Sequence, residues 1–111
     1  MTPTIQNNYV VQDRELRNVD VVTQKTQQLV AALNDEQREL MLSYFAHKLR
    51  RRPVSLEHIS QMLNSLRGDV GGVDIGRMSV PVAMAILDQA CDQMWYALPA
   101  DDRLLRLRAV K

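Results

Sequence analysis

Glycine and proline occupy few positions in this chain, and their distribution limits the possible folds more than any other sequence feature. All four glycines lie between residues 68 and 76, and three of the four prolines are at positions 53, 81 and 99. Helices exclude both residue types from their interiors. The glycine-rich segment therefore predicts a loop, and the long stretches that lack both residues predict helices.

The first such stretch predicts a long helix over residues 13–33. Its apolar and threonine residues recur at alternating steps of three and four, which is the spacing of one helical stripe: Leu16, Val19, Thr23, Thr26, Val30 and Leu33. Asp13 suits the N-cap position. The preceding residues 1–12 are mostly polar, and we expect them to form an extended, flexible arm.

Capping residues predict where the next two helices begin. Asn34 and Gln37 have the spacing of a capping box, and Pro53 is expected to stop the helix that they open. Ser55 suits the N-cap of a third helix that runs to about Arg67.

The fourth helix has the clearest periodicity in the chain. We expect Ser79 to cap it and Pro81 to lie in its first turn. Its stripe steps by four, three, four, three and four: Val80, Met84, Leu87, Cys91, Met94 and Leu98. Pro99 ends this helix and can open a fifth. The tail around residues 105–108 also alternates like a strand, but a helix is the favoured interpretation.

These segments predict an all-α fold, a compact bundle of four to five helices in one domain over residues 13–111. The chain has 111 residues, 46% of them apolar, which is enough for one core without disulfides or metal. The threonine seam of the first helix and the stripe of the fourth both offer lengthwise packing faces, so we expect a symmetric homodimer. No apolar run is long enough to span a membrane, and a single cysteine favours a reducing, cytoplasmic location.

The residue pattern gives little support to catalysis, to a metal or to a cofactor. His47 and His58 are far apart in sequence and fall on different helices, and Cys91 lies on an apolar stripe where we expect an inert core thiol. The glycine segment lacks the Lys-Ser/Thr pair of a phosphate-binding loop. We therefore expect no enzyme activity, no metal site and no cofactor.

Binding to another protein is the leading functional hypothesis. Trp95 and Tyr96 are adjacent on the fourth helix and cannot readily both enter one core; whether Trp95 belongs to the core or to an interface stays open. We expect a non-catalytic regulator that inhibits or sequesters a protein such as a transcription regulator, in the manner of an anti-activator. The expected anchors are Trp95, Tyr96, Met84 and Leu87, with Arg50, Arg51 and Arg52 as steering charges.

A sequence-specific DNA-binding regulator is the alternative hypothesis. The helices around residues 35–67 resemble the two helices of a helix-turn-helix in their order. The expected contacts are phosphates for Arg50, Arg51 and Arg52, and bases for His58, Gln61 and Asn64. A formal net charge of only +1 makes this reading the second choice.

Overall fold

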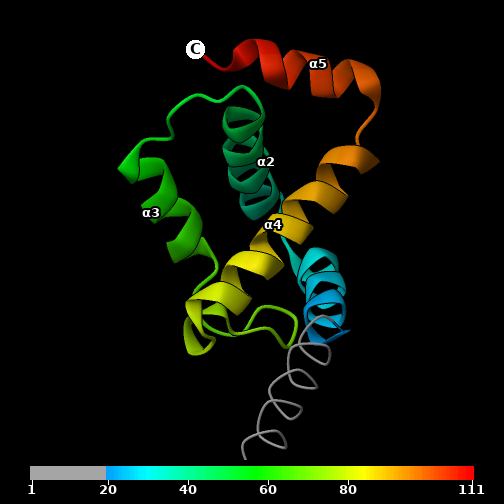
Figure 1. Cartoon of the computed structure of the whole chain (residues 1–111). Coiled ribbons are helices and arrows are strands. Elements are labelled where there is room, and N and C mark those ends of the chain that lie inside the picture. The colour runs from blue at the N-terminus through cyan, green and yellow to red at the C-terminus, as the bar shows by residue number, and fades with distance from the viewer. Residues whose placement is uncertain (1–19) are drawn as a thin grey trace, which may run out of the picture.

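The computed structural model describes residues 20–111, and the regular structure in that range is helical, which confirms the all-α prediction (Figure 1). An N-terminal helix over residues 20–32 is followed by α2 (Asp35–Leu49), α3 (Leu56–Ser65), the 3-10 helix η1 (Ile75–Arg77), α4 (Val80–Ala97) and α5 (Ala100–Ala109). The tail after Pro99 is thus a helix. The expected arm 1–12, and residues 13–19 of the predicted first helix, lie outside the described residues.

Asn34, Ser55 and Ser79 each stand at the N-cap of the helix that they were predicted to begin, and two of the three make a capping hydrogen bond. The Asn34 side chain accepts a hydrogen bond from the Gln37 N–H at 2.8 Å, and Gln37 Oε1 accepts one from the Asn34 N–H at 2.8 Å, which completes the capping box. Ser55 Oγ accepts a hydrogen bond from the His58 N–H at 3.1 Å. Ser79 is the N-cap residue of α4, as expected, but its side chain makes no capping hydrogen bond.

α2 ends before it reaches Pro53, through a backbone motif that does not involve the proline. Its last residue is Leu49, and Arg51 follows with φ of 53°, in the left-handed region. The Arg51 N–H donates to Lys48 O at 3.0 Å and the Arg52 N–H donates to His47 O at 2.9 Å. This is the Schellman pattern, in which the left-handed position is usually glycine. An arginine there strains the backbone by roughly 1 kcal/mol.

We therefore predict that Arg51→Gly raises the free energy of unfolding by about 0.5 kcal/mol, since relief of strain exceeds the added freedom of the unfolded chain. Urea unfolding followed by circular dichroism measures it. Arg52→Gly is the matched control, because it removes the same charge where φ is not positive, and it should lower stability. A lower urea midpoint of unfolding for both variants would contradict the conclusion that Arg51 is strained in the left-handed region.

α2 lies at the centre of the bundle and contacts α3, α4 and α5 (Figure 1). Gln37 Nε2 donates to Ser65 O at the end of α3 at 2.7 Å, the Phe45 ring lies 5.7 Å from the Trp95 ring of α4, and Glu39 forms an ion pair with Arg106 of α5. A helix with neighbours on several sides has no single apolar face. Leu49, an apolar residue in its last turn, is accordingly 44% exposed.

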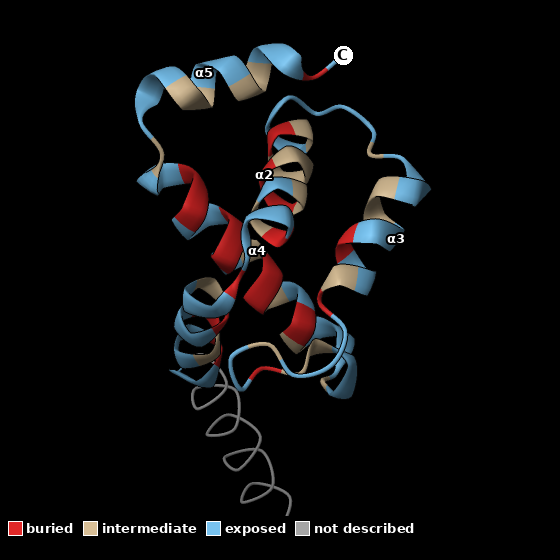
Figure 2. Cartoon of the chain, turned by 180° about the vertical axis from the view of Figure 1, so that it is seen from behind, coloured by how far each residue is buried: buried red, intermediate tan, exposed pale blue. Residues whose placement is uncertain are grey.

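The buried face of α4 is rotated from the predicted stripe. Its buried residues are Ala83, Ile86, Leu87, Ala90, Cys91, Met94 and Trp95, and they follow the inner side of the helix in Figure 2. Val80 and Met84, the first two residues of the predicted stripe, are 74% and 40% exposed. α4 therefore packs through a broader face that includes Ile86 and Trp95.

The segment between α3 and α4 is a loop, as its glycines predict, and it docks against the N-terminal helix. Val70 and Val73 exchange backbone hydrogen bonds of 2.9 and 3.0 Å around Gly71 and Gly72. Lys25 Nζ of the N-terminal helix donates to Gly72 O at 3.2 Å. Val73 is fully buried, so the loop closes one side of the core.

Polar contacts attach α5 to α2. Arg106 donates two hydrogen bonds to the Glu39 carboxylate, at 2.8 and 2.9 Å, and a third to Asp102 at 2.9 Å. The hydrogen bonds from Arg106 lower the pKa of Glu39, and the same pairing raises the pKa of Arg106. α5 itself contributes no fully buried residue, although Val110 directly after it is buried.

Candidate protein-binding surface

The four expected anchor residues do not form one surface. Trp95 and Leu87 are each only 3% exposed, so they are core residues rather than surface anchors, which corrects the sequence-based expectation. Met84 and Tyr96 are 40% and 61% exposed. They are separated by about 18 Å along the axis of α4 and by about 120° around it, so one partner side chain cannot contact both.

The faces that suggested a homodimer are partly covered within the chain. Of the threonine seam, Thr26 is fully buried and Leu33 is 7% exposed, whereas Thr23 is exposed and Val30 is half-buried. Leu16 and Val19 lie outside the described residues. The central part of the α4 stripe is buried as well. A homodimer remains a prediction.

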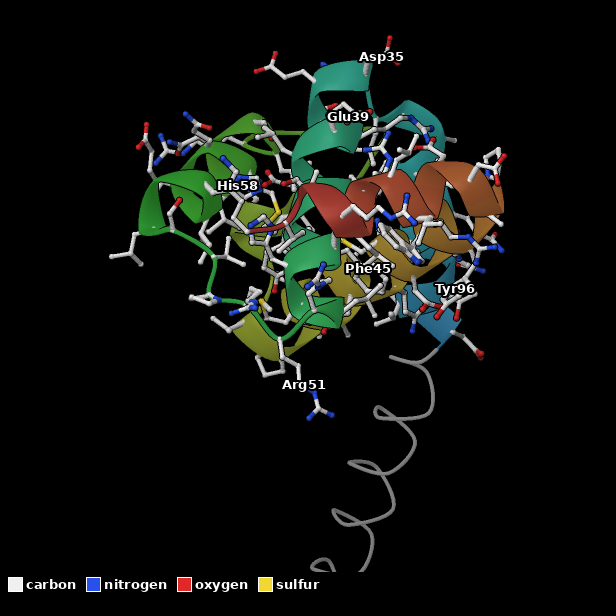
Figure 3. All side chains as sticks on the ribbon, turned by 90° about the horizontal axis from the view of Figure 1, so that it is seen from above. Asp35, Glu39, Phe45, Arg51, His58 and Tyr96 are labelled. Carbon is white, nitrogen blue, oxygen red and sulfur yellow. The ribbon has the colours of Figure 1, made fainter. Side chains whose placement is uncertain are left out.

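The arginines that follow α2 differ in their contacts. Arg50 Nη1 donates to Leu107 O of α5 at 2.9 Å, so this residue links two helices. Arg51 and Arg52 are exposed, and neither forms an ion pair with any residue in the range 20–111. Figure 3 shows Arg51 extending away from the ribbon into solvent.

The expected DNA-reading residues are only partly available. Six residues, 50–55, join α2 to α3, whereas a helix-turn-helix uses a turn of three or four. His58 Nε2 lies 3.0 Å from Leu40 O, so this half-buried ring holds α3 against α2 instead of facing a ligand. Gln61 and Asn64 are exposed, as the hypothesis requires.

The fold brings the two histidines together, which their sequence spacing does not suggest. The ring centroids of His47 and His58 are 6.2 Å apart, and His47 Nδ1 lies 2.7 Å from Ser43 O. One nitrogen of each ring is thus engaged with a backbone carbonyl of α2. Within the described range no group of three or more His, Cys, Asp or Glu side chains is arranged to hold a metal ion.

Cys91 lies in the core and is unsuited to nucleophilic chemistry. Its side chain is 1% exposed, and Sγ donates a weak hydrogen bond to Met41 O at 3.6 Å. Burial raises the pKa of the Cys91 thiol to about 12.

We predict that the thiol of the native protein resists modification by a disulfide reagent at about pH 8, because the thiolate is the reactive form and little of it is present. The absorbance of the thiol that the reagent releases measures the extent of reaction. In concentrated urea, where burial is lost, one equivalent should react quickly. Rapid modification of the folded chain would place Cys91 near solvent.

Two hollows beside α2 are lined by charged side chains, most of which are already paired inside the molecule. One, of about 520 Å³, is lined by Arg38, Arg106 and Glu39, among others. The Arg38 guanidinium donates to Val30 O and Leu33 O, and Arg106 is bound to Glu39. A smaller hollow of about 220 Å³ shares Glu39 and Arg106. These groups hold the helices together and leave little for a ligand to bind.

A third hollow, which we name the α3 pocket, has uncommitted side chains. It measures about 400 Å³ and lies between the second half of α3 and η1; its lining residues are Ser60, Leu63, Asn64, Leu66, Arg67, Gly68, Ile75 and Gly76. Leu63 is 43% exposed although it belongs to the apolar face of α3. The side chains of Asn64 and Arg67 have no hydrogen-bond or ion-pair partner in the described part of the chain.

Sequence reasoning identified Asn64 but neither Leu63 nor Arg67 as a site residue. The signal was Gly68, which follows the end of α3 with a φ of 77° and lets the chain return beside that helix. The return places Ile75 opposite Leu63, which local periodicity does not predict.

None of the described helices is both long enough and apolar enough to cross a membrane. Comparisons of the chain with protein-family models, with curated proteins and with solved structures find no match.

Proposed function

We propose that this protein is a small, non-catalytic regulator that binds a partner protein, such as a transcription regulator, and inhibits or sequesters it in the manner of an anti-activator. The observation that carries the proposal is the α3 pocket, whose lining combines apolar side chains with the polar side chains of Asn64 and Arg67, which have no partner among the described residues.

The pocket suits an apolar anchor side chain from a protein partner. Leu63 and Ile75 offer apolar contact area, and burial of such area drives most protein association. Arg67 and Asn64 can bind polar groups that flank the anchor. Anchors of this kind in well-packed pockets dominate many interfaces. The lining contains no His, Cys, Asp or Glu, which are common acid–base and nucleophilic groups, and this supports binding over catalysis.

The test is recovery of a partner from the lysate of the native host on the tagged, full-length chain, with and without nuclease. We expect a protein near stoichiometric amount that survives nuclease treatment. Leu63→Asp should reduce its recovery at least about tenfold, because a carboxylate would lie in the apolar site.

Val21→Asp is the matched control, since Val21 is similarly exposed (41%) but lies on the N-terminal helix. Circular dichroism should confirm that both variants remain folded. A partner that is equally retained by Leu63→Asp would exclude the α3 pocket. Recovery of nothing but nucleic acid and its bound proteins would exclude the sequestering role.

DNA binding is the second candidate, and the observation that favours it is the exposure of Arg51, Arg52, Gln61 and Asn64. If this role is correct, Arg51→Ala combined with Arg52→Ala should weaken binding and reduce its logarithmic salt slope by about 2. Leaving Arg50 unchanged preserves its bond to Leu107 O. Unchanged DNA affinity would exclude this docking face.

A further inference from the structure

We propose that a second surface, at the end of the bundle where α2 and α5 finish, is a docking site for an acidic, amphipathic protein segment. We call this surface the basic end and define it by Arg50, Arg51, Arg52 and Arg108. It lies on a different part of the molecule from the α3 pocket, so the inference goes beyond the proposed function.

The fold brings together two basic segments that are far apart in the sequence. Arg50 Nη1 donates to Leu107 O at 2.9 Å, next to Arg108. Ala109 and Val110 line one hollow together with Ala46 and His47 of α2. Figures 1 and 2, which view the molecule from opposite sides, both place the C-terminal end of the chain beside the connection from α2 to α3.

The positive charge at this end is largely uncompensated. Arg51, Arg52 and Arg108 are exposed and form no ion pair with any described residue. Two nearby acids are used elsewhere, since Asp88 pairs with Lys48 and Glu39 pairs with Arg106. Glu57 in the first turn of α3 is exposed and forms no ion pair with any described residue, so it offsets only part of the positive charge. A partner rich in carboxylates would supply the missing negative charge, and complementary charge would also speed its encounter.

Exposed leucines stand among these arginines. Leu49 and Leu56, on either side of the arginine run, are 44% and 81% exposed. On α5, Leu104 and Leu105 are 48% and 65% exposed and lie one helical turn before Arg108. Phosphate recognition uses cations and hydrogen-bond donors and gains little from aliphatic side chains. The mixture of leucine and arginine therefore favours a protein segment that combines acidic and apolar residues over a nucleic acid.

Fluorescence anisotropy with defined probes tests the inference on the full chain. The main probe is a labelled peptide of about 20 residues with Leu at helical spacing and Glu elsewhere. The comparison probes are an all-Glu peptide of similar length and a duplex DNA of about 20 base pairs. Each is measured at about 50 mM and about 300 mM salt, because screening separates charge from apolar contacts.

We expect the amphipathic peptide to bind most tightly and its affinity to fall at the higher salt. Arg51→Glu combined with Arg52→Glu should weaken it about tenfold, and Arg108→Glu alone about threefold. Arg77→Glu is the matched control for Arg108→Glu, because it makes the same charge change away from the basic end and outside the α3 pocket, and it should change affinity less than about twofold.

Three outcomes overturn the inference: no peptide binding at low salt, an equal loss in the control variant, or tighter binding of the all-Glu peptide or the duplex. These results are separate from those on the proposed function. If Leu63→Asp abolishes recovery of the lysate partner and the amphipathic peptide does not bind the unchanged protein, only the proposed role of the basic end is overturned. Peptide binding at the basic end without any recovered protein partner overturns the α3 pocket alone.

Discussion

Gly71→Ala is expected to lower the free energy of unfolding by about 3 kcal/mol. Gly71 has φ of 62°, which strains any residue with a side chain. A Cβ at this position would also lie 2.5 Å from Ala32 Cβ and 2.8 Å from Gln28 O, both on or at the end of the N-terminal helix. The backbone oxygen cannot move aside as a flexible side chain would, so the loop must withdraw from the helix.

Gly68→Ala separates the effect of backbone strain from the effect of a steric clash. Gly68 also has positive φ, 77°, but a Cβ there meets nothing within 4 Å. We expect a loss of only about 1 kcal/mol. Urea unfolding followed by circular dichroism measures both variants. Equal losses would show that Gly71 does not pack against the N-terminal helix as described.

Trp95→Ala is expected to lower the free energy of unfolding by about 4 kcal/mol. This variant therefore tests the core and does not test partner binding. Trp95 is 3% exposed and packs against Phe45, so its removal leaves a large cavity between α4 and α2. Since Trp95 is the sole tryptophan of the chain, circular dichroism must replace intrinsic fluorescence as the probe for this variant.

Tyr96→Ala is the neighbouring control. Tyr96 is 61% exposed, and its main described contact is the Arg103 guanidinium, 5.7 Å from the ring centroid. We expect a loss below about 1 kcal/mol. If Trp95→Ala kept wild-type stability, Trp95 would belong to a surface and the core of α4 would be wrongly described.

The features that local sequence determines were predictable. The Asn34–Gln37 capping box, the Ser55 cap and the glycine loop depend on residues within a few positions of one another, and all three appear as expected. The core role of Cys91 followed from its place on a regular stripe. Such signals need no knowledge of which helices become neighbours.

Features that depend on neighbours were not predictable in the same way. Trp95 is buried because Phe45 of α2 lies beside it, and the stripe of α4 alone left its role open. α2 ends at Leu49, ahead of the strained Arg51, instead of at Pro53, since residues compatible with a left-handed position are not limited to glycine. The α3 pocket and the basic end each join segments that meet through the tertiary fold.

The attachment of α5 has a consequence for how the native protein opens. Without a fully buried residue of its own, α5 is held by the Arg106–Glu39 pair, the Arg50 bond to Leu107 O, the half-buried Leu107 side chain and the buried Val110. A segment held in this way should unfold locally at a lower free energy than the whole domain. Its amide hydrogens should therefore exchange with deuterium sooner than those of α2 and α4, and sooner still in high salt. Arg108, the residue of the basic end that belongs to α5, would then be displaced whenever α5 unfolds briefly while α2 and α4 remain folded.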